Sequence, residues 1–125
     1  MLPISPTPPT PLRQCLAEFL LSGDLVEAAR CIRELNARYF FHEVVKRAVT
    51  QAVDKPAAQQ LQMSSLLVFL VEADMLTTAQ AAKGFRRLYS IVDDLVLDAP
   101  SAPAVLDQFR QRAVSDGVLP ATFST

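Results

Sequence analysis

Apolar residues recur at helical spacing along almost the whole chain, and this pattern limits the fold more than any other feature. Residues 12–20 carry leucine, cysteine and phenylalanine at i, i+3, i+4, i+7 and i+8, which is the spacing of one buried helix face. No stretch of useful length alternates apolar and polar residues in the manner of a strand. The sequence therefore predicts an all-α protein.

Six helices follow from this pattern, separated by short gaps that carry capping and breaking residues. Asp24, Thr77 and Ser101 are suitable N-cap residues, and Gly23 and Gly117 can adopt the left-handed conformation that commonly ends a helix. Because the gaps are short, consecutive helices should pack as antiparallel pairs, giving three stacked hairpins in the manner of a helical repeat protein. The helices are expected at about residues 10–21, 24–38, 40–53, 56–73, 77–92 and 101–116.

A proline-rich start precedes the helical part of the chain. Residues 1–11 contain five prolines among serine and threonine, a composition that favours an extended linker over a helix. Residues 12–120 hold all the helical patterns and form the expected domain, and residues 121–125 should be frayed. Ser5 and Thr7 precede prolines in the linker and are candidate sites for proline-directed phosphorylation.

The composition argues against several classes of function. A net charge of −1 and the absence of tryptophan give no general attraction to nucleic acid and few side chains for base stacking. Direct RNA binding is therefore not expected, although some basic residues could cluster if two helices abut, namely Arg30, Arg33, Arg38, Lys46 and Arg47. Apolar runs are too short to cross a bilayer, and no signal peptide pattern is present. A cytoplasmic protein is expected, with the nucleus as a second location.

Few residues offer chemistry for catalysis or metal binding. Cys15 and Cys31 each lie on an apolar helix stripe, which predicts two reduced core cysteines. His42 has no second titratable partner at useful spacing, so a packed or capping role is expected. One histidine and two dispersed cysteines are too few ligands for zinc. The sequence predicts neither an enzyme nor a bound metal, cofactor or small-molecule substrate.

One acidic segment stands between two helices, at residues 91–100, with the sequence Ile-Val-Asp-Asp-Leu-Val-Leu-Asp-Ala-Pro. Asp94 and Asp98 are four residues apart, which places both on one side whether the segment is helical or extended. No lysine or arginine occurs from residue 88 to residue 109 to neutralise them. Apolar neighbours, Leu95 with Leu97 or Val96, should tie the segment to the core. The simpler alternative is a solvated loop with ordinary helix-flanking aspartates.

Five blocks, in this order, resemble the MI domain family, which is also written MA-3: residues 19–28, 41–45, 83–85, 93–100 and 113–120. The resemblance covers nearly the whole chain and implies a fold of stacked helical hairpins related to HEAT repeats, with six to seven helices. It also implies a protein-binding role. Members of the family bind the DEAD-box RNA helicase that serves as initiation factor four-A, and inhibitory members thereby lower translation.

The resemblance further implies which residues contact the helicase. The family presents the acidic segment before its last helix, and the contacting positions match Asp94 and Asp98, with Asp93 beside them and Pro100 after them. The family often has glycine near Asp74. Inhibitory members carry two or more copies of the domain, so this chain is expected to be one of several copies in a larger protein. A helical scaffold for a different partner, ribosome-associated or signalling, is the alternative.

Overall fold

The structure is a computed structural model that describes residues 11–35 and 41–123, and within them it contains helices and no strand. The all-α prediction is confirmed. Pro11, the last residue of the expected linker, already begins the first helix, and the rest of that linker lies outside the described residues. The helices are α1 (Pro11–Ser22), α2 (Leu25–Glu34), α3 (Phe41–Ala52), α4 (Ala57–Glu72), α5 (Thr78–Ser90), α6 (Val92–Asp98) and α7 (Ala102–Ser115).

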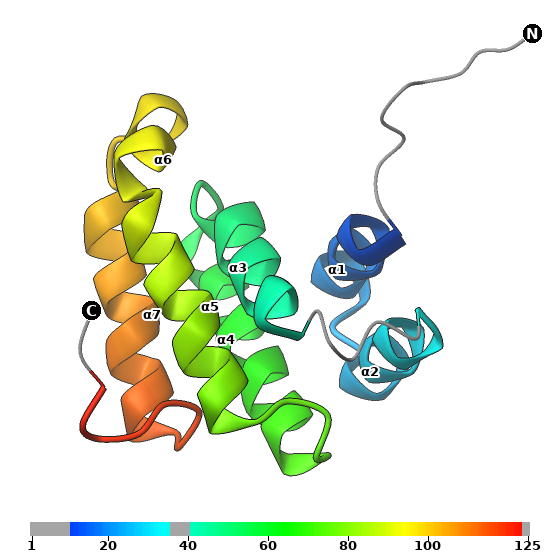
Figure 1. Ribbon diagram of the computed structural model, residues 1–125. Coiled ribbons are helices and arrows are strands. Elements are labelled where there is room, and N and C mark those ends of the chain that lie inside the picture. The colour runs from blue at the N-terminus through cyan, green and yellow to red at the C-terminus, as the bar shows by residue number, and fades with distance from the viewer. Residues whose placement is uncertain (1–10, 36–40, 124–125) are drawn as a thin grey trace, which may run out of the picture.

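The helices form three layers that stand side by side. Figure 1 shows α1 with α2 at one side of the molecule, α3 with α4 in the middle, and α5 with α7 at the other side. The middle layer holds the other two together, because α3 packs against both α1 and α5, and α4 packs against α2 and α7. The short α6 lies at one end of the last layer and contacts α5 and α7. Two of the three predicted hairpins are formed by consecutive helices, α1 with α2 and α3 with α4, whereas in the third the short α6 stands between α5 and α7 in the chain.

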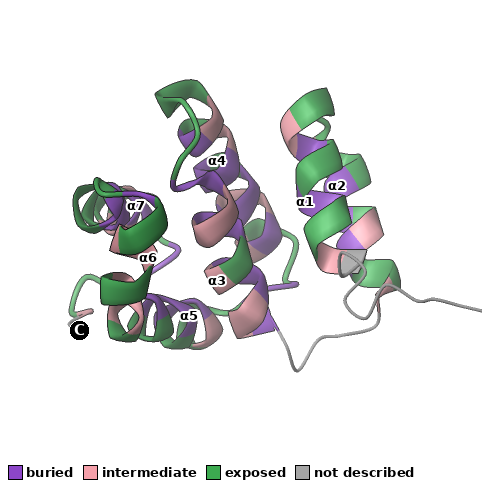
Figure 2. Cartoon of the chain, turned by 90° about the horizontal axis from the view of Figure 1, so that it is seen from above, coloured by how far each residue is buried: buried purple, intermediate pink, exposed green. Residues whose placement is uncertain are grey.

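The core runs through all three layers. Figure 2 shows that the buried faces of the helices turn toward one another and that the exposed faces lie outside. Phe19, Phe85 and Phe109 are fully buried, one in each of α1, α5 and α7. Val118 and Leu119 fold back onto the core after α7. None of the helices in the described part of the chain is both long enough and apolar enough to cross a membrane.

Most of the predicted helix ends are observed. The Asp24 carboxylate accepts a hydrogen bond of 3.0 Å from the backbone N–H of Glu27, and Gly23 before it has a φ of +71°. Thr77 and Gln80 form a reciprocal capping box, with bonds of 3.1 and 3.0 Å. The N-cap prediction for Ser101 is wrong, since its side chain makes no capping hydrogen bond. Its φ of −86° and ψ of 6° differ from the extended backbone of a typical N-cap residue.

The predicted fifth helix is interrupted at Ile91. The apolar stripe of this helix continues to Val92 in the sequence, but Ile91 has a φ of −113° and a ψ of 9°, and its N–H bonds to the carbonyl of Leu88 at 3.1 Å. The chain turns there and α6 begins. The acidic segment is therefore a separate helix, a point that the sequence pattern left open.

Two backbone features accommodate the sharp turns and close packing around α5. A Cβ atom at Gly84 would lie 2.7 Å from the carbonyl oxygen of His42 and 2.8 Å from Cβ of Val45, so α3 and α5 approach each other closely at this point. Asp74, in the turn between α4 and α5, has a φ of +60°. Glycine is the residue that adopts this conformation most readily, so Asp74 holds a backbone position that is unusual for a residue with a side chain.

The prediction of two reduced cysteines is wrong. A disulfide joins Cys15 of α1 to Cys31 of α2, with 6.0 Å between the two Cα atoms. Spacing along the sequence did not reveal the pairing, because the two residues meet only when α1 and α2 fold into an antiparallel hairpin. The bond ties together the outer layer, which packs on the rest of the molecule through α3 and α4.

Candidate protein-binding site

The acidic segment is a helix whose carboxylates face the solvent. Asp93 and Asp94 lie in the first turn of α6 and Asp98 is its last residue, so Asp94 and Asp98 stand one turn apart on the same side. All three aspartates are exposed. Their position in sequence predicted a shared face, and the helical conformation provides it.

Few contacts anchor this helix, and they differ in part from the expected ones. Val92 and Leu95 pack partly against the core, as predicted for Leu95. Leu97 does not anchor the segment, because its side chain is 82% exposed. It points away from the core because α6 lies on the surface, and only one side of a surface helix can face inward. Leu97 therefore adds an apolar group to the exposed acidic surface.

The backbone after α6 fixes the position of Pro100. Ala99 is buried and extended, with a φ of −141° and a ψ of 95°, and its N–H bonds to the carbonyl of Leu95 at 2.9 Å. Its own carbonyl accepts a 2.8 Å bond from the N–H of Ala102 at the start of α7. Pro100 lies between these two anchored residues and is exposed. It therefore stands on the rim of the acidic surface at a fixed place.

The negative charge of α6 is not neutralised within the described residues. None of the ion pairs or side-chain hydrogen bonds in residues 11–35 and 41–123 involves Asp93, Asp94 or Asp98. The ion pairs that do form lie on α2, α3 and α7. An exposed, uncompensated acidic face with one leucine is suited to a basic partner surface.

A polar network that the sequence analysis missed joins the two helices beneath α6. The Tyr89 hydroxyl on α5 donates a 2.6 Å hydrogen bond to Oδ1 of Asp107 on α7, and it accepts a 2.9 Å bond from Nε of Arg110. Burial raises the pKa of Tyr89, and the hydrogen bond to Asp107 raises it further. Tyr89 lies three residues before Val92, the first residue of α6, so the network helps to hold the start of that helix in place. The only sequence signal was the i, i+3 spacing of Asp107 and Arg110.

The remaining candidate residues do not form a reactive site. His42 is half-buried on α3, and burial lowers its pKa, with further lowering by the positive charges of Lys83 and Arg87. No carboxylate or nucleophile is hydrogen-bonded to it in the described part of the chain. Within those residues no three histidine, cysteine or acidic side chains come together as metal ligands. Of the candidate residues singled out from the sequence, those on α6 form a distinct exposed surface.

Comparison with known families assigns most of the chain to one family. The family model described as the MA3 domain matches residues 12–120. The chain belongs to the MA3 domain family. MA3 is the family that the sequence blocks resemble under its other names, MI and MA-3, and it is a non-enzymatic family.

The relatives of this MA3 domain include plant proteins named translation regulatory factors and animal proteins named programmed cell death protein 4. MA3 domain-containing translation regulatory factor 1 of Arabidopsis thaliana is 42% identical over 112 residues, which are 90% of this chain and 16% of that protein. Programmed cell death protein 4 of Gallus gallus is 34% identical over 105 residues, and that of Homo sapiens is 32% identical over 105. Both matches cover 83% of this chain and 22% of the relative. The chain therefore spans less than a quarter of the length of these relatives.

Proposed function

We propose that this MA3 domain binds the DEAD-box RNA helicase initiation factor four-A and regulates cap-dependent translation initiation, by inhibition. The observation that carries the proposal is the exposed acidic face of α6, whose Asp94 and Asp98 have no ion-pair partner in the described residues. The family supports it, since the relatives include proteins named translation regulatory factors.

The proposed mechanism is electrostatic and steric complementarity. Asp94 and Asp98 pair with arginine or lysine on the helicase, and Asp93 adds to the negative potential that guides the encounter. Leu97 and Pro100 pack beside the charged contacts and exclude water from them. Removing one partner of a buried charged pair costs about 2–5 kcal/mol, which is roughly 30-fold or more in affinity. The two central aspartates should therefore dominate binding.

The arrangement of the chain is part of the same proposal. The expected linker, without Pro11, which begins α1, leads into the helical domain that continues to residue 120, and the domain is one of several copies in a larger protein. The lengths of the relatives leave room for such copies. The proposed location is the cytoplasm, where translation initiation takes place, with the nucleus as a second location. Thiols are kept reduced in the cytosol, so the Cys15–Cys31 bond would be open to reduction there.

A titration of the purified chain against the helicase tests the proposal. The variant Asp94→Ala with Asp98→Ala should lose at least about 30-fold in affinity while its helical circular dichroism is unchanged. The matched control is Glu18→Ala with Glu72→Ala, which removes two exposed carboxylates on α1 and α4 and should bind like the natural chain. Raising the salt concentration should weaken binding of the natural chain, because exposed charges are screened.

Two results would contradict this assignment. Retained binding by the α6 variant would show that another surface contacts the helicase. Absence of binding by the natural chain, together with recovery of a different protein that the α6 variant does not recover, would favour the alternative of a scaffold for another partner.

A further inference from the structure

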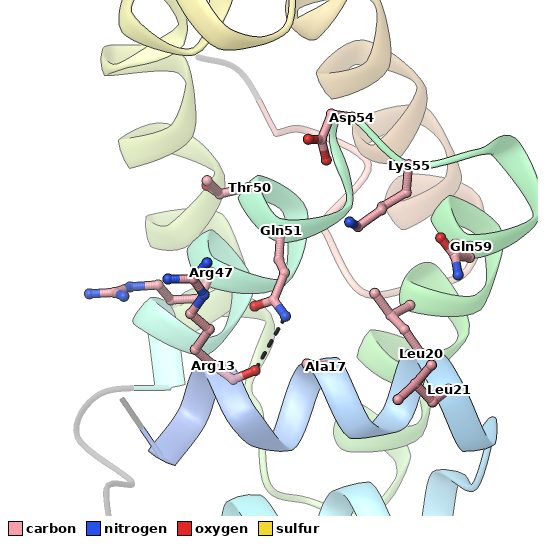
Figure 3. Close-up of a pocket in the computed structure, with 10 residues that line it drawn as sticks. All are labelled: Arg13, Ala17, Leu20, Leu21, Arg47, Thr50, Gln51, Asp54, Lys55 and Gln59. Atoms are coloured by element: carbon pink, nitrogen blue, oxygen red, sulfur yellow. Dashed lines mark hydrogen bonds between the residues drawn. The ribbon is translucent and has the colours of Figure 1, made fainter. Parts of the chain in front are cut away.

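A cleft opens between α1 and the α3–α4 hairpin, on the side of the molecule away from α6. Its volume is about 640 Å³. Figure 3 shows the side chains of Arg13 and Arg47 beside each other at one end, while Lys55 extends into the cleft from the α3–α4 turn. Gln51 lies between them and donates a 3.2 Å hydrogen bond to the carbonyl oxygen of Arg13, which ties α3 to α1 at the wall of the cleft.

The lining of the cleft is basic and partly apolar. Arg13, Arg47 and Lys55 contribute three positive charges against the single carboxylate of Asp54. Arg47 reaches Glu43 only through a partly exposed pair, with 3.5 Å between Nε and the carboxylate oxygen. Leu21 also lines the cleft and is 89% exposed. A ligand that suits this cleft is a peptide segment with carboxylates and at least one exposed apolar side chain.

The acidic helix α6 has this chemistry. It presents Asp94 and Asp98 without ion-pair partners, and Leu97 between them is 82% exposed. Among the described residues, four large apolar side chains are strongly exposed. Two of them lie on these surfaces: Leu21 lines the cleft, and Leu97 belongs to α6. The two surfaces therefore complement each other in charge and in apolar character.

The two surfaces cannot meet within one folded domain. Figures 1 and 2 place α6 at one side of the molecule and α1 at the opposite side, with the layer of α3 and α4 between them. The α6 segment can reach such a cleft only on another molecule or on another copy of the domain. From the charge and apolar complementarity of the α1–α3–α4 cleft with α6, we propose that the cleft binds the α6 segment of a second copy of this domain.

The contact is head-to-tail, because it joins two different surfaces of the same fold. Such an interface leaves one cleft and one α6 free at the ends and can continue to further copies. It is weak for separate chains, but a linker between copies raises the effective concentration to the millimolar range. If α6 also binds the helicase, as proposed above, the cleft of a neighbouring copy competes with the helicase for the same aspartates.

Self-association of the purified chain, measured without helicase, tests this proposal independently of the proposed function. Sedimentation equilibrium between about 10 µM and 1 mM should show concentration-dependent association at low salt that weakens at high salt. The cleft variant Arg47→Glu with Lys55→Glu should raise the dissociation constant at least tenfold, and so should the helix variant Asp94→Lys with Asp98→Lys. The matched control is Lys83→Glu with Arg87→Glu, which makes the same change of charge on the exposed side of α5 and should associate normally.

Mixing the cleft variant with the helix variant gives the decisive measurement. In the cleft variant both the cleft and α6 are negative, and in the helix variant both are positive, so each variant alone is repelled by its own copies. In the mixture, the negative cleft of one variant can bind the positive α6 of the other, and the natural α6 of the first can bind the natural cleft of the second. Restored association in the mixture supports the proposal. A natural chain that stays monomeric at about 1 mM, association that survives the cleft substitutions, or a mixture that does not associate would overturn it. Circular dichroism of each variant confirms that the helices remain folded.

Discussion

The Tyr89 hydroxyl and the Asp107 carboxylate lie 2.6 Å apart and join α5 to α7 directly below the acidic helix. The two residues are far apart in the sequence, yet together with Arg110 they close the layer on which α6 rests. The position of Asp94 and Asp98 relative to the rest of the surface therefore depends on a contact outside the acidic segment itself.

Replacing Tyr89 by phenylalanine tests this link. The ring remains and only the hydroxyl is lost, so we expect the free energy of unfolding to fall by about 1 kcal/mol, which is typical for one hydrogen bond. Urea denaturation of Tyr89→Phe, Asp107→Ala and the double variant gives the coupling between the two residues. Additive effects of the two substitutions would show that the hydrogen bond contributes nothing to stability.

Replacing Gly84 by alanine should destabilise the domain, although alanine normally stabilises a helix by about 1 kcal/mol relative to glycine. The added Cβ would lie 2.7 Å from the His42 carbonyl oxygen and 2.8 Å from Cβ of Val45, so α3 and α5 must move apart. Overpacking of this kind costs about 1–3 kcal/mol. Thermal unfolding shows whether the substitution raises or lowers the stability of the domain. An increase in the melting temperature would contradict the close contact between the two helices.

Reduction of the Cys15–Cys31 disulfide should lower the free energy of unfolding by about 3 kcal/mol, as expected for a closed loop of this size. Denaturation with and without reductant measures the change, and mass spectrometry of alkylated chain counts the free thiols. The variant Cys15→Ala with Cys31→Ala should be less stable and insensitive to reductant. Two free thiols in the unreduced protein, or equal stability in both conditions, would contradict the bond.

Stability should fall as His42 becomes protonated. Burial, with Lys83 and Arg87 nearby, lowers the pKa of His42 in the folded state, so the unfolded chain binds the proton first as the pH decreases. The contribution of neutral His42 to the free energy of unfolding is fully present above its pKa in the unfolded chain, which is about 6.5. This contribution is lost as the pH falls through the lower pKa that His42 has in the folded state.

Urea midpoints at about pH 7.5 and pH 5.5 measure this effect, because they lie on either side of the ordinary histidine pKa of about 6.5. We expect the lower midpoint at the lower pH. Since His42 is the only histidine in the chain, His42→Gln should remove most of the difference in this interval. An equal pH dependence in the variant would assign the effect to other groups.

The helices themselves were predictable from the sequence because their signals are local. The i, i+3, i+4 spacing around Leu16 and Phe19, and the bonds of Asp24 and Thr77 to backbone groups three residues on, involve only nearby residues. The acidic segment was also visible as a run of residues without neutralising charge. Its helical geometry was not decided by the pattern, because the spacing of Asp94 and Asp98 fits both helical and extended conformations.

Only the tertiary structure decided which residues meet across elements. The pairing of Cys15 with Cys31 requires the α1–α2 hairpin, and the bond between Tyr89 and Asp107 requires the packing of α5 on α7. Leu97 is exposed because α6 packs on the core through the side that carries Val92 and Leu95, which residue type alone did not reveal. Sequence periodicity fixes which face of a helix is apolar, whereas the partner of each face, and the surfaces left uncovered, depend on how the layers stack.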